Sequence, residues 1–184
     1  MTLALATAPS RGTPAAGRRS GKAVARAGVL VAFALWSGAA TAEEVVFDPT
    51  ALIDCLDQGA QLVCVGAGAE ECVRRNLPST PVIAACGREE YRYWQGLVDR
   101  AYARRVARGQ SIDDMTEFAD PQPPRRAEAL EAAYAAWQEF RDLQCAHVEA
   151  EWWGGTGRGS AYFRCMMELT AGYALFLQPD IWQE

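Results

Sequence analysis

The sequence contains a single histidine, His147, and a single lysine, Lys22. Catalysis by a Ser-His-Asp or Cys-His group would have to use that one histidine, and the six cysteines are better placed in disulfides. No two cysteines form a C-x2-C pair, which is the usual spacing in a zinc site. Cofactor fingerprints are also absent. The sequence therefore predicts a protein that is not an enzyme and that holds no metal and no cofactor.

A long apolar run is also absent. A membrane-spanning helix needs about 18 apolar residues, and residues 27–42 are too few and are interrupted by Ser37-Gly38. Residues 1–26 hold five basic residues and no acid, and Ala40-Thr41-Ala42 follows the apolar run. This order is typical of a cleavable secretory signal peptide. We expect cleavage after Ala42, which leaves residues 43–184 as one domain, without membrane attachment, in the periplasm of a Gram-negative bacterium or secreted.

Positive charge is scarce in residues 43–184. They contain thirteen basic residues, all arginine, against 23 acidic ones, which gives a net charge of −10 at neutral pH. Nucleic acids and anionic membranes need a basic surface, so neither is an expected partner. A cationic protein is a reasonable partner, although net charge also simply keeps an exported protein soluble.

No repeat and no useful strand-type alternation occurs in residues 43–184. The pattern predicts an all-α fold: a small antiparallel bundle of three main helices with a disulfide-stapled N-terminal helical part. Apolar residues that recur every three or four positions predict these helices, and glycine and proline predict a connector. The main helices are expected over 83–108, 125–153 and from an N-cap at Ser160 to Pro179, shorter ones over 48–59 and 64–76, and the exposed connector over 109–124.

All six cysteines lie in residues 43–184, and an even number in a small exported domain predicts disulfides. Cys145 and Cys165 lie on consecutive predicted helices, so an antiparallel hairpin would bring them together. The other four cysteines can pair in three ways, and the sequence does not settle which. We favour Cys55–Cys64 with Cys72–Cys86, because short-range pairing closes each N-terminal segment onto the next.

Arg141 lies on the apolar stripe of its predicted helix, one turn after Trp137. A guanidinium in that place needs a carboxylate, and the preceding long helix offers Glu89 or Glu90. We therefore expect a structural ion pair. Trp137 and Trp94 are expected to be core residues.

The segment 152–160 is the predicted partner-binding site. Two adjacent tryptophans on a helix cannot both face the core, because successive side chains point about 100° apart. One of them is then exposed beside glycines that let the backbone approach a partner closely. The competing interpretation is a plain turn held by Cys145–Cys165. The residues expected to contact a partner are Trp152, Trp153, Gly154, Gly155, Thr156 and Arg158.

Three stretches of this region together resemble a known family. They are the Trp137 to Cys145 segment with its Phe140-Arg141-Asp142, the turn Gly154-Gly155-Thr156, and Cys165 to Thr170 with its Leu169-Thr170. Upstream, Cys86 to Tyr102 fits the same pattern. Over roughly Cys72–Leu177 the sequence resembles the LprI-like lysozyme-inhibitor family. It departs from the family pattern at Val98-Asp99 and at Ala171-Gly172-Tyr173, and it lacks the cysteine through which the founding inhibitor is lipid-anchored.

The resemblance implies a small helical periplasmic domain without enzymatic activity whose partner is a cationic lysozyme-type hydrolase. An acidic body would steer lysozyme toward it, and Arg158 would meet the catalytic carboxylates. The alternative is an envelope interaction or scaffold domain that binds another protein or a glycan.

Overall fold

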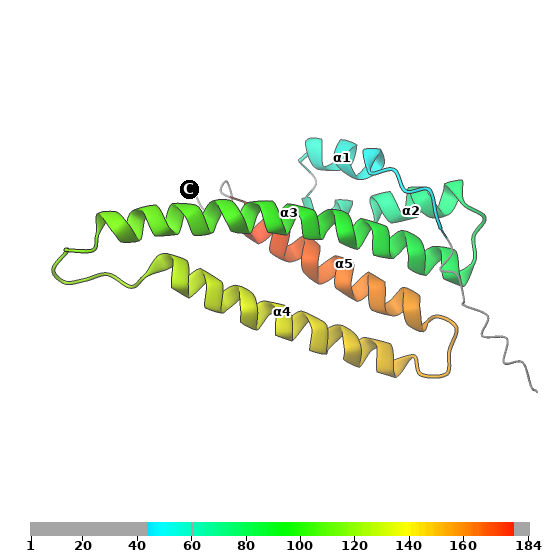
Figure 1. Ribbon diagram of the computed structural model, residues 1–184. Helices are drawn as coiled ribbons and strands as arrows, with labels where there is room; N and C mark the ends of the chain where they lie inside the picture. The colour runs from blue at the N-terminus through cyan, green and yellow to red at the C-terminus, as the bar shows by residue number, and fades with distance from the viewer. Residues whose placement is uncertain (1–43, 60, 179–184) are drawn as a thin grey trace, which may run out of the picture. The chain divides into compact units, whose positions relative to one another are not determined.

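A computed structural model describes residues 44–59 and 61–178 of the protein (Figure 1). This part of the chain is helical and contains no strand, which confirms the predicted all-α fold. The expected signal peptide at residues 1–42 and the expected stop at Pro179 lie outside the described residues. The elements are α1 (Thr50–Asp57), the 3-10 helix η1 (Gln61–Cys64), α2 (Ala67–Arg75), α3 (Thr80–Met115), α4 (Arg126–Glu151) and α5 (Arg158–Phe176).

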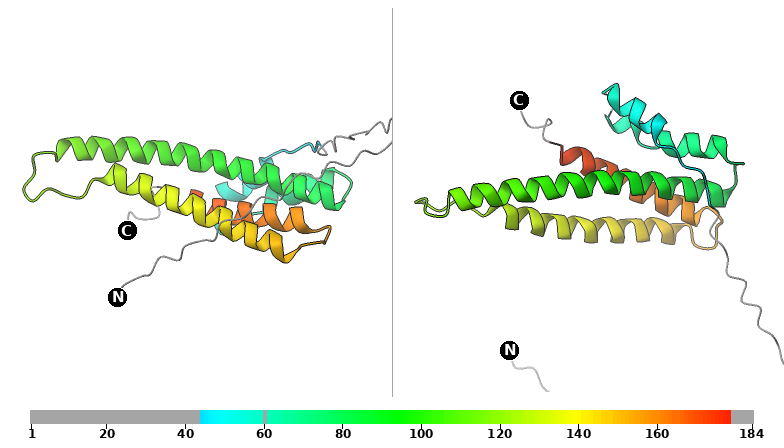
Figure 2. Two further views of the ribbon diagram at one scale, coloured as in Figure 1. Left: turned by 60° about the horizontal axis from the view of Figure 1, so that its bottom comes forward. Right: turned by 45° about the horizontal axis from the view of Figure 1, so that its top comes forward.

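Helix α3 is the centre of this arrangement. It contacts α2, α4 and α5, and α1 packs on α2 and η1. Figures 1 and 2 show α4 running along α3 in the opposite direction, while α1 and α2 lie beside the N-terminal half of α3. The core includes Leu52, Trp94, Val98 and Ala171, each fully buried. Among the described residues, no helix is long and apolar enough to cross a membrane.

Helix α3 is longer than the sequence predicted. It continues through Gly109 to Met115, so the expected start of the connector at residue 109 is wrong. Gly109 is buried, and a Cβ there would lie 3.0 Å from the backbone nitrogen of Ala127. The glycine therefore allows α3 and α4 to approach closely instead of ending the helix. Ser160 was expected to be the N-cap of α5, but Gly157 occupies that position and the Ser160 hydroxyl donates to the Thr80 carbonyl.

The start of α2 is held by a side chain from α3. Gly66 is the N-cap of α2 and offers no capping side chain. The fully buried carboxylate of Glu90 accepts hydrogen bonds from the backbone N–H groups of Gly66 and Ala69, both at 2.7 Å, and from Trp94 Nε1 at 3.0 Å. A Cβ at Gly68 would lie 3.2 Å from Glu90 Oε2. Two glycines therefore let the carboxylate reach the otherwise unpaired N–H groups of the first turn.

Helix α3 also holds the start of α4. Arg125 precedes α4 and provides no side-chain cap. The buried Asp113 accepts from the backbone N–H groups of Arg126 at 2.8 Å and Ala127 at 3.1 Å. These two hydrogen bonds, with a smaller contribution from the nearby guanidinium groups, hold the pKa of Asp113 below its ordinary value of 3.8.

The three disulfides are Cys55–Cys64, Cys72–Cys86 and Cys145–Cys165, which are the pairs favoured from the sequence. The first joins α1 to η1, the second joins α2 to α3, and the third joins α4 to α5. Cys72–Cys86 thus attaches α2 directly to α3, whereas Cys55–Cys64 closes α1 onto η1.

The predicted ion pair between Arg141 and Glu89 or Glu90 is wrong. Glu90 is occupied by α2, and Glu89 pairs with Arg88 and Arg92. Arg141 instead pairs with its neighbour Asp142, at 2.9 Å. The backbone N–H groups at the start of α2 bind the Glu90 carboxylate. The Arg141 guanidinium is neutralised by the adjacent Asp142 instead.

Arg141 also contacts the aromatic rings between α3, α4 and α5. Its Nη1 donates to Gln95 Oε1 at 2.8 Å, and its guanidinium lies 4.9 Å from the centre of the Trp137 ring. Trp137 stacks on Tyr173 with ring centres 4.1 Å apart. Trp94 is fully buried, as expected, whereas Trp137 is only half-buried.

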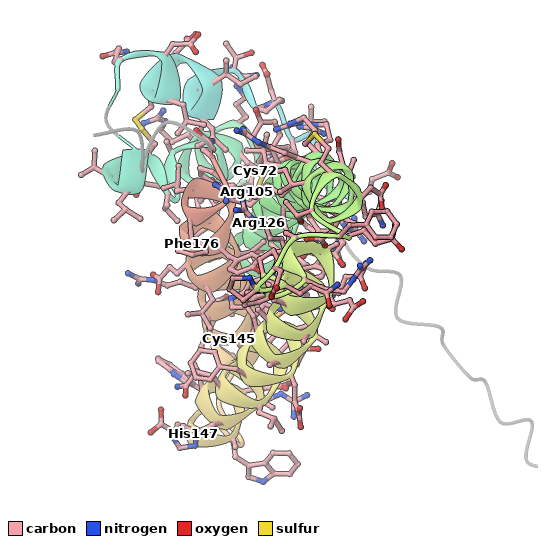
Figure 3. All side chains as sticks on the ribbon, turned by 90° about the vertical axis from the view of Figure 1, so that its left-hand side faces the viewer. Cys72, Arg105, Arg126, Cys145, His147 and Phe176 are labelled. Carbon is pink, nitrogen blue, oxygen red and sulfur yellow. A yellow bond between two sulfur atoms is a disulfide. The ribbon has the colours of Figure 1, made fainter. Side chains whose placement is uncertain are left out.

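The end of α5 is also fixed by α3. Arg105 Nε donates to the Leu177 carbonyl at 2.7 Å, and its Nη2 donates to the Gln178 carbonyl at 3.2 Å. Figure 3 shows Arg105 between the two helices. A guanidinium at a helix C-terminus satisfies carbonyls that have no partner within the helix.

Replacing Glu90 by glutamine will destabilise the fold. The amide keeps one acceptor oxygen but turns an N–H group toward the start of α2, so we expect a loss of about 1–3 kcal/mol in urea denaturation. Glu89→Gln is the matched control, and its partly exposed ion pairs contribute less than about 1 kcal/mol. Equal stability of Glu90→Gln and wild type would contradict the capping role.

Asp113→Ala will destabilise the protein at neutral pH, and the effect will diminish in acid. Because the folded-state pKa lies below 3.8, the carboxylate contributes its full stability above pH 3.8 and loses it as the pH falls through the folded-state value. Thermal unfolding from pH 7 to pH 2 measures this difference. The exposed neighbour Asp114 provides the control Asp114→Ala. A difference between Asp113→Ala and wild type that did not change with pH would rule out this linkage.

Candidate functional site

The candidate site is the α4–α5 loop, residues 152–157, with Arg158 at the start of α5. The backbone N–H groups of Trp152 and Trp153 donate to carbonyls in the last turn of α4, at 3.2 and 3.1 Å. Gly154 then adopts a φ of +78°, a conformation that favours glycine, and reverses the chain. The disulfide Cys145–Cys165, with Cα atoms 5.5 Å apart, joins the two helices behind the loop.

The two adjacent tryptophans have different environments. Trp153 is 80% exposed, whereas Trp152 is 52% exposed. The Trp152 ring lies against Gly157, where a Cβ would come within 2.8 Å of ring atom Cζ3. Any side chain at position 157 would therefore displace this ring. Gly157 thus has a packing role that the sequence did not reveal.

Arg158 lies beside the exposed tryptophan. Its Nε is 3.1 Å from Glu149 Oε1, and its guanidinium carbon is 5.5 Å from the centre of the Trp153 ring. Glu149 and Trp153 therefore hold Arg158, half-exposed, at the loop surface. The role of Glu149 was not predicted from the sequence, although this residue lies in the last turn of α4, directly before the loop.

The exposed part of the loop continues through Gly154, Gly155 and Thr156. Thr156 also lines a shallow pocket with Thr80 and Pro81 at the start of α3. All six residues expected to contact a partner therefore lie together in the structure. His147 lies at the surface of α4, as Figure 3 shows, with Nε2 3.7 Å from Glu151 Oε1.

A groove adjoins the loop. It has a volume of about 1170 Å³ and is lined by residues of α2, the first part of α3, the last part of α4, and α5. Trp152 and Gly157 line it at the loop end. Its apolar lining includes Val65, Ala69, Val73, Ile83 and Met167. Among the described residues, no group of three or more His, Cys, Asp or Glu side chains is arranged to hold a metal ion.

Comparison with known proteins gives two matches. The family described as "Lysozyme inhibitor LprI" matches residues 72–177. An uncharacterised 17.7 kDa protein from the puhA 5′ region of Rhodobacter capsulatus is 30% identical over 132 residues, which are 68% of this chain and 81% of the relative. No solved structure matches the chain.

Gly157→Ala will change the loop. The added methyl group would lie 2.8 Å from the Trp152 ring, so the ring must move into solvent. We expect a red-shifted tryptophan emission and faster hydrogen exchange in residues 152–157. Gly159→Ala is the matched control, because its methyl group would make an ordinary 3.5 Å contact with Ala84. Identical spectra and exchange for Gly157→Ala and wild type would show that the ring does not pack there.

Proposed function

Because the chain belongs to the family of the lysozyme inhibitor LprI, we propose that it inhibits a lysozyme-type cell-wall hydrolase through the α4–α5 loop. The observation that carries this proposal is the adjacency of Trp153 and Arg158, one exposed ring and one guanidinium on a narrow turn. The three disulfides and the family match indicate an extracytoplasmic protein, which is where such hydrolases act.

The loop chemistry complements a glycosidase cleft. Such clefts contain a pair of catalytic carboxylates flanked by sites for sugar rings. In the complex, Arg158 donates from its two terminal nitrogens to those carboxylates, since a planar guanidinium binds carboxylate groups in a two-point geometry. Trp153 occupies an adjacent sugar site with its flat apolar ring. Glu149 holds Arg158 in place through Nε before binding.

The structure that supports the loop reduces the entropy cost of binding. Cys145–Cys165 fixes the ends of the hairpin, and Trp152 packed on Gly157 supports the turn from within. A loop that is already ordered loses less conformational entropy when it binds. The net charge of −10 in residues 43–184 attracts a cationic enzyme and accelerates its association.

Arg158→Glu will abolish inhibition of a susceptible lysozyme. The replacement places a carboxylate against the catalytic acids, so we expect the inhibition constant to rise about 100-fold or more. The assay titrates oxidised protein against several lysozymes at low and physiological salt. Arg125→Glu provides the same charge change at the other end of α4.

The outcomes separate the site from the function. If the wild type inhibits a lysozyme and Arg158→Glu inhibits it equally well, the contact lies elsewhere on the molecule. Failure of the wild type to inhibit any lysozyme would reject the inhibitor function itself.

A further inference from the structure

Most arginines of the described chain are paired. Of the thirteen, eight form ion pairs, and Arg105 donates to the end of α5. Among the described residues, the remaining four arginines form no ion pair: Arg100, Arg104, Arg108 and Arg126. Residues 43–184 contain a large excess of acidic residues. A shortage of acids therefore does not explain why these four arginines lack an ion pair.

Three of these arginines form a row on α3. Arg100, Arg104 and Arg108 are all exposed and recur every four residues, so they share one face of the helix. The helix rises about 1.5 Å per residue, which places successive members about 6 Å apart along its axis. Arg100 Nη1 lies 3.4 Å from the position of a Cβ on Gly96, so its guanidinium lies over the backbone of the preceding turn.

Among the residues of α3, no acid lies within one turn of the row on its own face. Asp99 precedes Arg100 but accepts a hydrogen bond from Gln95 at 2.7 Å. Residues adjacent in sequence point to different sides of a helix. The exposed residues Ala107 and Ser111 lie on the same side as the row and are uncharged. The acidic described part of the chain thus carries a basic strip along α3, from Arg100 to Arg108.

We propose that the row Arg100, Arg104 and Arg108 binds a linear polyanion whose carboxylates repeat along a strand, such as the peptide-bearing glycan strands of the bacterial cell wall. Exposed guanidinium groups at regular spacing match carboxylates presented along a chain. Each contact is individually weak in water, and several contacts in series give avidity.

The charges around the row favour a strand over an anionic bilayer. Asp114, Glu117 and Asp120 are exposed directly after the row, at the end of α3 and in the connector. A flat anionic surface that met the row would also meet these carboxylates and the net negative charge of the domain. A strand contacts only the basic face.

The row is distinct from the α4–α5 loop. Arg100 lies twenty residues from Thr80, which is about 30 Å along the axis of α3, and Thr80 borders the loop. The row therefore holds the protein on the wall while the loop stays accessible to a hydrolase. This binding goes beyond inhibition and does not depend on it.

The test is co-sedimentation of the full exported protein with purified peptidoglycan sacculi over a range of NaCl concentrations. Wild type will sediment with sacculi, and added salt will release it. The variant R100Q/R104Q/R108Q will bind at least fivefold less. The control R74Q/R125Q/R164Q removes the same charge from three arginines that are paired and dispersed, and it will bind like wild type.

Three results would overturn the proposal: no binding of wild type, equal binding of wild type and the row variant, or equal loss in the control. Binding of wild type to vesicles containing phosphatidylglycerol but not to sacculi would assign the row to membranes instead. Lysozyme inhibition, measured on a soluble chito-oligosaccharide, reports on the loop separately. The row variant is expected to retain it, so the two proposals can fail independently.

Discussion

The buried carboxylate of Glu90 connects three parts of the fold. It belongs to α3, it accepts from two backbone N–H groups at the start of α2, and it accepts from the indole of Trp94 in the core. A carboxylate in this position is stable only while all of these donors remain in place. The glycines at the start of α2 let α2 pack closely against α3, and the disulfide Cys72–Cys86 joins the same two helices.

Side chains in the C-terminal half of α3 also bind the ends of neighbouring helices. Asp113 binds the start of α4, and Arg105 binds the end of α5. Polar side chains of one helix thus fix the ends of three others. With the helix ends fixed in this way and the hairpin closed by Cys145–Cys165, the α4–α5 loop is presented on a rigid base. Trp153 is 80% exposed and Arg158 is half-exposed, so both side chains are accessible to a partner.

Periodicity predicted the helices because it follows from local pattern, and the preference for short-range pairing favoured the observed disulfides, although the sequence left three pairings of four cysteines open. The predicted partner of Arg141 was wrong. An apolar stripe shows that a charge is buried, but it does not show which acidic residue reaches that charge. The N–H groups at the start of α2 compete for Glu90, and that competition appears only in three dimensions. Gly109 was misassigned for a similar reason, since a glycine that ends a helix and one that admits a neighbouring helix look alike in sequence. In the site, the tryptophan pair indicated the loop, but the contact of Trp152 with Gly157 depends on the turn geometry.

We propose that the α4–α5 loop is the surface that meets a hydrolase. Hydrogen exchange of the oxidised protein, alone and saturated with a lysozyme, can locate the contact. We expect protection on binding to concentrate in residues 152–160, with α1 and the α3–α4 connector unchanged. Protection centred on another surface, with residues 152–160 exchanging as in the free protein, would contradict it.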